Sequence, residues 1–189
     1  MIVAVLALQG AFIEHEQVLQ QLGAETVEIR QLADWEDFVA SPASEKGLVL
    51  PGGESTVQLR LLRDLGLYEP IRQAIVDGLP VFGTCAGMIL LSESHLATMD
   101  VRVRRNAYGR QLGSFHAVNK VEGLGNDVPM TFIRAPYIEE VLSSDCQVLA
   151  TVDGHIVAAR QSNQLATAFH PELDEDRRMH QLFLSMIKK

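Results

Sequence analysis

The sequence contains one cysteine whose neighbours suit covalent chemistry. Cys85 lies in GTCAG at residues 83–87, a G-x-C-x-G pattern between a short apolar run and a helix-like segment. This pattern is the thiol form of a nucleophile elbow, in which flanking glycines relieve crowding at a sharp strand-to-helix turn. The helix N-terminus that follows would favour a thiolate and offer a backbone N–H to an oxyanion. A small cysteine buried at a glycine-rich turn is the alternative interpretation.

A histidine and a carboxylate near the end of the chain supply what a thiol nucleophile needs. In His170-Pro171-Glu172 the proline favours an extended conformation, which turns the first and third side chains to the same side. Glu172 can then orient His170 as a base towards Cys85, although such a tripeptide can also cap a helix. The other histidines lack this context and are expected to be surface or ordinary core residues, namely His15, His95, His116, His155 and His180.

The stretch PGGEST at residues 51–56 is predicted to share an edge of the sheet with Cys85. It follows an expected strand and precedes an expected helix, and ligands bind where parallel strands end. Paired glycines let the backbone approach a substrate and turn an N–H towards an oxyanion, and Glu54 suits an ammonium group. A tight turn with Ser55 or Thr56 as N-cap is compatible with that role.

Alternating patterns predict the scaffold of the first half. The apolar run at residues 1–8 is typical of a strand buried on both faces, and a helical pattern at 11–22 follows it. Repeated βα alternation predicts a central, mostly parallel sheet with helices on both faces. The further strands are expected at 25–30, 47–52 and 79–83, and the further helices at 56–65, 69–76 and 86–96.

The second half predicts antiparallel β structure and a closing helix. Short β-like runs separated by turn residues lie at 114–118, 130–135, 147–152, 155–161 and 164–169. Residues 174–188 carry apolar side chains at helical spacing, with acids first and lysines last, as a helix dipole prefers.

Composition limits the classes of function. The chain of 189 residues suits a single domain spanning 1–189, and its net charge of −8 argues against a general nucleic-acid or anionic-membrane surface. The basic run 102–110 is a local feature, and residues 1–8 are too short for a leader or a spanning helix, so a cytoplasmic protein is expected. The two cysteines form neither a disulfide framework nor a CxxC metal site, and Cys146 is expected to pack in the β-rich half.

The motifs taken together resemble the triad, or class I, glutamine amidotransferases, and more narrowly the glutaminase subunits of pyridoxal 5′-phosphate synthase. The matching stretches, in chain order, are VLALQGAFIEH, LVLPGGEST, VFGTCAGMILL, RRNAYGRQ, FIRAPYI, IVAARQ and AFHPELDED. The resemblance implies an α/β, flavodoxin-like three-layer fold with Cys85 as nucleophile, His170 as base and Glu172 as its orienting partner. Residues 92–100 depart from the pattern, because they are shorter than the usual loop and lack its proline and glycine.

The resemblance also implies a glutamine site. Its members are Gly53, Glu54 and Ser55, with Arg105 nearby and Ile133 and Arg134 closing the pocket. The residues alone leave Arg105 and Arg110 equally compatible with a solvated basic face, and Ile133 with the core.

The implied reaction releases ammonia from glutamine. The Cys85 thiolate attacks the carboxamide, backbone N–H groups of Gly53 and Ala86 hold the oxyanion, and His170 protonates the departing ammonia before water hydrolyses the thioester. The ammonia then passes to a partner synthase, a (β/α)₈ barrel in a large hetero-oligomer, which builds pyridoxal 5′-phosphate from ribose 5-phosphate and glyceraldehyde 3-phosphate. The resemblance implies no metal or bound cofactor.

The resemblance implies that the partner docks at the end of the first strand, around Gln9 and Gly10. Activation on docking would fit a loop at residues 52–53 that rearranges. Residues 14–16 either join this segment or form an exposed helix face.

Three other functions remain open from the residues. They are a glutaminase serving another synthase such as that for imidazole glycerol phosphate, a thiol peptidase or hydrolase, and a non-catalytic scaffold that regulates a synthase. The LQGAF, RNAYGRQ and FIRAP stretches argue against the first, glutamine specificity would exclude the second, and an intact triad argues against the third.

Overall fold

The computed structural model describes residues 1–105 and 114–188. Its first half is a parallel sheet built around β1 (Ile2–Leu6), whose five residues are all buried. β2 (Glu25–Ile29) and β3 (Lys46–Leu50) flank β1, and β4 (Val81–Thr84) pairs with β3, all in parallel. A strand with apolar side chains throughout needs cover on both faces, and helices supply it here.

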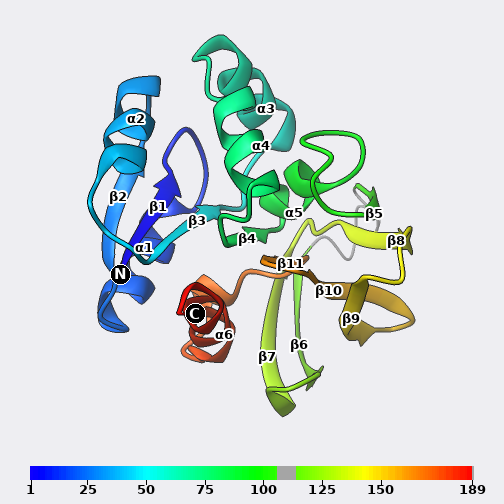
Figure 1. Cartoon of the computed structure of the whole chain (residues 1–189). Helices are drawn as coiled ribbons and strands as arrows, with labels where there is room; N and C mark the ends of the chain where they lie inside the picture. The colour runs from blue at the N-terminus through cyan, green and yellow to red at the C-terminus, as the bar shows by residue number, and fades with distance from the viewer. Residues whose placement is uncertain (106–113, 189) are drawn as a thin grey trace.

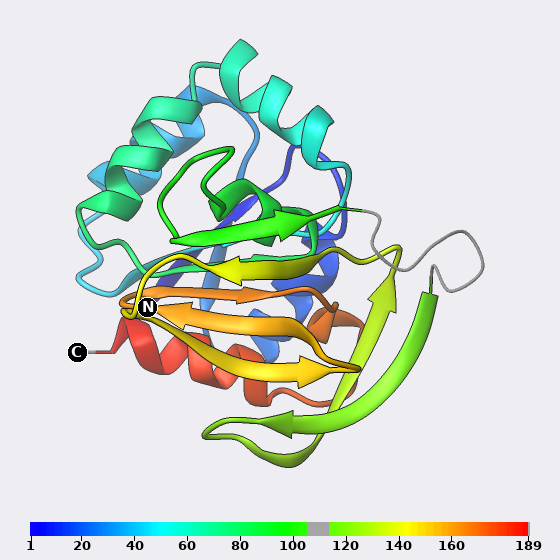
Figure 2. The same ribbon diagram turned by 90° about the vertical axis from the view of Figure 1, so that its right-hand side faces the viewer.

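The second half extends the same sheet with antiparallel strands. β11 (Gln164–Thr167) lies parallel to β4, and β10 (His155–Gln161) then pairs antiparallel with β11. The described strands order as β2-β1-β3-β4-β11-β10-β8-β5, where β8 is Tyr137–Val141, β5 is Val101–Arg104, and β9 (Cys146–Val152) pairs with β10. Figure 2 shows the antiparallel strands β5, β8, β10 and β9 side by side. The predicted α/β fold with an antiparallel second half is confirmed, except that β11 belongs to the parallel part.

A two-stranded ribbon leaves the sheet. It consists of β6 (Ser114–Val121) and β7 (Gly125–Ile133), which pair antiparallel only with each other in the described part of the chain. Figures 1 and 2 show it projecting beyond the antiparallel strands. Because the end of β7 comes back towards the sheet, it carries the residues that follow it to the neighbourhood of Cys85 and His170.

Helices cover both faces of the parallel part. Figure 1 shows α3 and α4 on one side and α6 on the other. The helices are α1 (Phe12–Gln21), α2 (Leu32–Ala40), α3 (Ser55–Asp64), α4 (Tyr68–Val76), α5 (Ala86–Leu91) and α6 (Arg178–Ile187). α2 was not predicted, and the predicted helix at 86–96 is too long, because α5 ends at Leu91.

The closing helix starts later than predicted, because the acidic residues before it have other partners. Asp174 accepts hydrogen bonds from the backbone N–H and the hydroxyl of Thr131 on β7, at 3.2 and 2.8 Å. Asp176 accepts from the backbone N–H of Arg178 at 2.8 Å, and its carboxylate also binds the Arg178 guanidinium. Asp174 therefore ties the ribbon, and Asp176 binds the first residue of α6, instead of forming its first turn.

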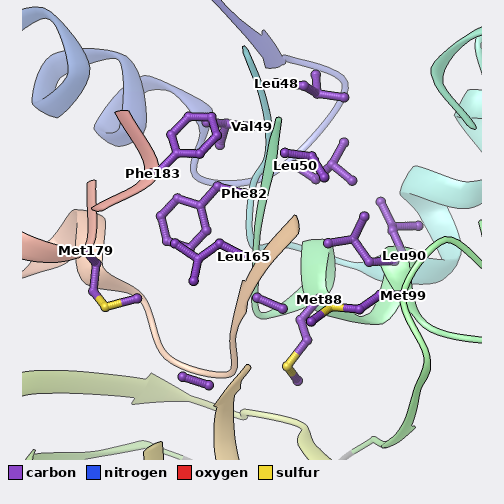
Figure 3. Packing of buried hydrophobic residues seen from close by; sticks show 14 of the residues in the cluster. Leu48, Val49, Leu50, Phe82, Met88, Leu90, Met99, Leu165, Met179 and Phe183 are labelled. Atoms are coloured by element: carbon purple, nitrogen blue, oxygen red, sulfur yellow. The ribbon is translucent and has the colours of Figure 1, made fainter. Parts of the chain in front are cut away.

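The core lies between the sheet and the helices on each face. Figure 3 shows Phe82 and Phe183 on one side of the strands and Leu90 and Met99 on the other. The helices approach closely where glycines allow it. A β-carbon on Gly47 would lie 2.4 Å from Cδ1 of Ile187 in α6. In the described residues, no helix has the length and apolar character needed to cross a membrane.

Candidate active site

Cys85 lies on the turn between β4 and α5 in a strained conformation. Its φ of 49° and ψ of −100° lie outside the regions that side-chain-bearing residues favour. Its backbone N–H donates to the carbonyl of Thr167 on β11 at 2.7 Å, which fixes the turn against the sheet. The strain is typical of a nucleophile elbow, because it presents the side chain at the carboxyl edge of the parallel strands.

The two glycines of the G-x-C-x-G pattern are required by close packing. A β-carbon on Gly87 would lie 1.9 Å from the carbonyl oxygen of Leu50, so α5 can rest directly on β3 only with glycine there. A β-carbon on Gly83 would lie 2.7 Å from the backbone of Gly87. The pattern therefore places the start of α5 immediately beneath Cys85.

His170 and Glu172 form the second half of the site. Nδ1 of His170 lies 2.6 Å from Oε1 of Glu172, and both side chains are buried. The expected extended conformation is wrong beyond His170, because Pro171–Leu173 form a short 3-10 helix, η1. The turn still brings the two side chains together. The backbone N–H of His170 donates to Thr131 on β7 at 2.8 Å, which anchors it.

The charges of the site are coupled. Burial alone would lower the pKa of His170, but hydrogen bonds to Cys85 and Glu172 raise it to about 10. Burial likewise opposes ionisation of Glu172, yet its pKa is lowered overall, first by the electrostatic effect of His15 and then by the hydrogen bond from His170. At neutral pH His170 is therefore an imidazolium between the Glu172 carboxylate and the sulfur of Cys85.

The loop at residues 51–54 is held by the segment that follows β1. The carbonyl of Gly52 accepts a hydrogen bond from the N–H of Ala11 at 3.0 Å, and the N–H of Glu54 donates to Oε1 of Gln9 at 2.8 Å. The Gln58 amide on α3 donates to the carbonyl of Gln9 at 2.9 Å. Gly53 has a φ of 156°, and a β-carbon there would lie 2.5 Å from Oε1 of Gln9. Gln9 thus makes two of the contacts that fix this loop.

The residues expected to bind glutamine surround Cys85. A cavity of about 200 Å³ is lined by Gln9, Gly53, Glu54, Cys85, Ile133, Arg134 and His170. A smaller one of about 30 Å³ is lined by Gly53, Glu54, Ser55, Cys85, Ile89, Arg105, Arg134 and Pro136.

The structure decides between the alternatives for several of these positions. Ile133 is 39% exposed and lines the larger cavity, so its placement in the core is wrong. Arg105 lines the smaller cavity, whereas Arg110 and the remainder of the RRNAYGRQ stretch lie outside the described residues. Ala86, the second expected oxyanion donor, follows Cys85 as the first residue of α5.

Sequence reasoning missed one residue of the site. His15 was expected on the surface, in the ordinary core or in a partner-facing segment, and its side chain is fully buried and contacts the carboxylate of Glu172. Its Nε2 lies 3.3 Å from Oε2 of Glu172. No local pattern marks it, because only the packing of α1 beside η1 brings the two residues together. Cys146 is buried as expected, and burial raises its pKa to about 11, which disfavours a thiolate at this position.

A larger cavity lies at the opposite edge of the sheet. It measures about 580 Å³ and is lined by residues where the parallel strands begin, including Lys46 and Pro80, and by the ends of α2 and α6. Among the described residues, no cysteine or histidine lines it. Size alone would favour it as a ligand site, but Cys85 and His170 line the cavity at the other edge.

The fold and site place the chain in the class of glutamine amidotransferases. A solved structure titled "Crystal structure of glutamine amidotransferase" superposes with a TM-score of 0.89 at 39% identity and covers 100% of both chains. The structure of a putative GMP synthase component from Thermoplasma acidophilum shares the fold, with a TM-score of 0.73 at 18% identity, covering 100% of this chain and 94% of that one.

Residues 5–189 match the model of the SNO glutamine amidotransferase family, and the chain belongs to this family. It is 55% identical to the pyridoxal 5′-phosphate synthase subunit PdxT of Streptococcus pneumoniae (strain CGSP14), covering 99% of this chain and 97% of that one. It is also 55% identical to the PdxT subunit of Desulfitobacterium hafniense, with 98% and 92% covered. The resemblance found in the sequence is thereby confirmed.

Proposed function

We propose that this chain is the glutaminase subunit of a pyridoxal 5′-phosphate synthase and that Cys85, His170 and Glu172 are its catalytic triad. The observation that carries the proposal is the meeting of Cys85 and His170 at one cavity beside the Gly52-Gly53 loop, with Glu172 buried behind His170 and bound to its Nδ1. Similarity to PdxT subunits over nearly the whole chain supports the assignment to this synthase.

The first step forms a tetrahedral intermediate, which becomes a thioester when the C–N bond breaks in the second step. The Cys85 thiolate attacks the side-chain carboxamide of L-glutamine, and the carbonyl oxygen becomes an oxyanion. We assign its stabilisation to the N–H groups of Gly53 and Ala86. The geometry of the loop supports this role for Gly53, because the preceding carbonyl is held by Ala11 and a trans peptide turns its N–H the opposite way.

The second step releases ammonia. The His170 imidazolium donates its proton to the leaving amide nitrogen, the C–N bond breaks, and the neutral imidazole then accepts a proton from water. The resulting hydroxide attacks the γ-glutamyl thioester, and Cys85 leaves as a thiolate with L-glutamate as product. Glu172 keeps the imidazole oriented throughout and stabilises its charged form.

Substrate recognition is assigned to the residues around the cavity. Glu54 supplies a negative charge for the α-ammonium group, while Arg105 and Arg134 supply positive charge for the α-carboxylate. Gly53 and Ser55 contact the substrate from the loop and the start of α3, and Ile133 closes the pocket.

The partner we propose is the (β/α)₈-barrel component of the synthase, with which this chain assembles into a large hetero-oligomer. The barrel uses the ammonia to build pyridoxal 5′-phosphate from ribose 5-phosphate and glyceraldehyde 3-phosphate. The description of the relatives as subunits of a synthase supports a heteromeric complex. We place the docking surface around Gln9 and Gly10, because Gln9 also binds the loop at residues 51–54.

The test is glutamate release from glutamine by the purified chain, alone and mixed with the barrel component of a pyridoxal 5′-phosphate synthase. Activation by the partner and its loss in Cys85→Ala are expected. If folded partners that form a complex release no glutamate, the proposed function is wrong.

A further inference from the structure

A series of buried polar side chains continues from the catalytic carboxylate into the core. Oε1 of Glu172 binds His170, whereas Oε2 has no well-aligned hydrogen bond among the described residues. The Nε2 atom of His15 lies 3.3 Å from this second oxygen, and neither side chain is exposed. A buried carboxylate with one unpartnered oxygen is costly, so the nitrogen that faces it matters.

His15 is held in place on both ring nitrogens. Its Nδ1 lies 2.9 Å from Nε2 of His180 on α6, and its Nε2 lies 3.0 Å from the hydroxyl of Thr84. Thr84 is the last residue of β4 and directly precedes Cys85 in the chain. From its place on α1, His15 therefore contacts both the last residue of the strand that leads to Cys85 and the carboxylate that orients His170.

Electrostatics assign the proton on the His15 ring. Burial lowers the pKa of His15 although Glu172 acts in the opposite direction, so the ring is neutral at neutral pH and carries one N–H. With that hydrogen on Nδ1, the lone pair of Nε2 would face the Glu172 carboxylate. The hydrogen therefore belongs on Nε2, between Oε2 of Glu172 and the hydroxyl of Thr84.

The assignment agrees with the surroundings of His180. If Nδ1 of His15 accepts, His180 must donate from Nε2, which leaves Nδ1 of His180 without a hydrogen. That nitrogen has no hydrogen-bond partner among the described residues, as suits a bare lone pair. The other charged groups that act on this pair are Glu14 and His170 on His15, and Arg177 on His180.

We infer that His15 is a positioning residue of the triad, whose Nε2–H holds the second oxygen of Glu172 and so fixes the orientation of His170 towards Cys85. His180 fixes the tautomer of His15. The inference rests on the proposed function for what the triad does, but it concerns the reactivity of Cys85 itself. Without the His15 donor, the Glu172 carboxylate can turn out of line with Nδ1 of His170, so it stabilises the imidazolium less, and the Cys85 thiolate loses part of its counter-charge.

A matched pair of variants isolates the Nε2–H donor. The side-chain amide of glutamine in His15→Gln reaches the position of Nε2, whereas the shorter amide in His15→Asn reaches only that of Nδ1. Both replacements are neutral and polar. We expect His15→Asn to lower kcat/KM by roughly 10- to 100-fold with KM little changed, which is the size of effect known for residues that orient metal-binding histidines. We expect His15→Gln to retain most of the activity.

The decisive measurement does not need glutamine. The rate of Cys85 alkylation by iodoacetamide is followed against pH, with Cys85→Ala as the blank for Cys146. We expect the profile of His15→Asn to move to higher pH and that of His15→Gln to stay close to the unsubstituted chain. If His15→Asn does not fold, the His180→Phe variant is measured in its place. In that variant His15 lacks the donor that fixes its tautomer, so we expect a smaller shift of the alkylation profile, also to higher pH.

The control is Leu19→Ala, which loosens the same helix at a fully buried position. Coinciding profiles for the Gln and Asn variants, or an equal shift in Leu19→Ala, would overturn the inference. If the profiles shift as expected while the unsubstituted chain and its partner release no glutamate, the proposed function fails and the positioning role stands.

Discussion

The α-carbon of Gly52 lies directly against the imidazole of His170. A β-carbon at position 52 would come within 2.3 Å of Cε1 and 2.9 Å of Nδ1 of that ring. Nδ1 is also the atom that binds Glu172, at 2.6 Å. The first glycine of the loop beside the cavity is therefore part of the wall that sets the position of the base.

Gly52→Ala should displace the His170 ring and lower glutaminase kcat by about 100-fold, the scale expected for a catalytic group moved by about 1 Å. The measurement is glutamate release together with circular dichroism, which should stay unchanged. Gly23→Ala is the control, because Gly23 has a φ of +84° but no atom within 4 Å of the added carbon. It should lose stability and keep its activity. Equal activities of the two variants would contradict the prediction.

The strained backbone at Cys85 predicts an unusual order of stability. Glycine normally destabilises a protein relative to alanine by about 0.5–1 kcal/mol. At a φ of 49° and a ψ of −100°, however, glycine relieves strain of about 1–3 kcal/mol that alanine retains. Cys85→Gly should therefore be more stable than Cys85→Ala by about 1 kcal/mol in urea unfolding, and both should be inactive. If the alanine variant is at least as stable as the glycine variant, the backbone at residue 85 is not strained.

Buried neutral histidines predict loss of stability in acid. Burial lowers the pKa of His180 well below the 6.5 of the unfolded chain, and that of His15 less strongly. Because their folded pKa values are depressed, the unfolded state binds more protons below pH 6.5. Stability is thus present above pH 6.5 and lost as the pH falls, by up to about 1.4 kcal/mol per pH unit for each histidine.

His180→Phe should make this acid-side slope shallower, as measured by urea unfolding between about pH 5 and 7. The ring packs against Phe82, so phenylalanine keeps the aromatic contact. Phe183→Leu on the same helix is the control and should lower stability without changing the slope. An unchanged slope in His180→Phe would mean that the ring is already protonated in the folded chain.

Gln58 predicts a link between α3 and catalysis. Its amide donates to the carbonyls of Gln9 and Pro51 at 2.9 and 3.2 Å, and it is fully buried. Gln58→Leu should cost about 1–3 kcal/mol of stability, because two carbonyls lose a donor, and should also lower kcat by freeing the loop that contains Gly53. Leu62→Ala, a buried change on the same helix, should lower stability by about 2–5 kcal/mol but leave kcat unchanged. A fall in kcat in both variants would assign the effect to general loosening.

Local pattern was sufficient for much of the fold. The buried run of β1 and the alternation that follows predicted the parallel strands, because a strand covered on both faces must be apolar throughout. α2, β5 and β8 were not predicted. α2 carries Trp35 and Phe38 at helical spacing, so its signal is present in the sequence. β5 and β8 pair with each other, β8 has an exposed Glu139-Glu140 pair and also pairs with β10, and this pairing defines the two strands.

The sequence by itself determined which residues can do chemistry. Cys85 needs its glycines because the turn is crowded, and Glu172 can reach His170 because only one residue separates them. Tertiary structure alone decided what supports them. His15 and His180 are 165 positions apart and carry no shared motif, yet they lie 2.9 Å from each other behind Glu172. Such a contact depends on how α1 and α6 pack against the sheet, and side-chain periodicity specifies the buried face of a helix but not its partners.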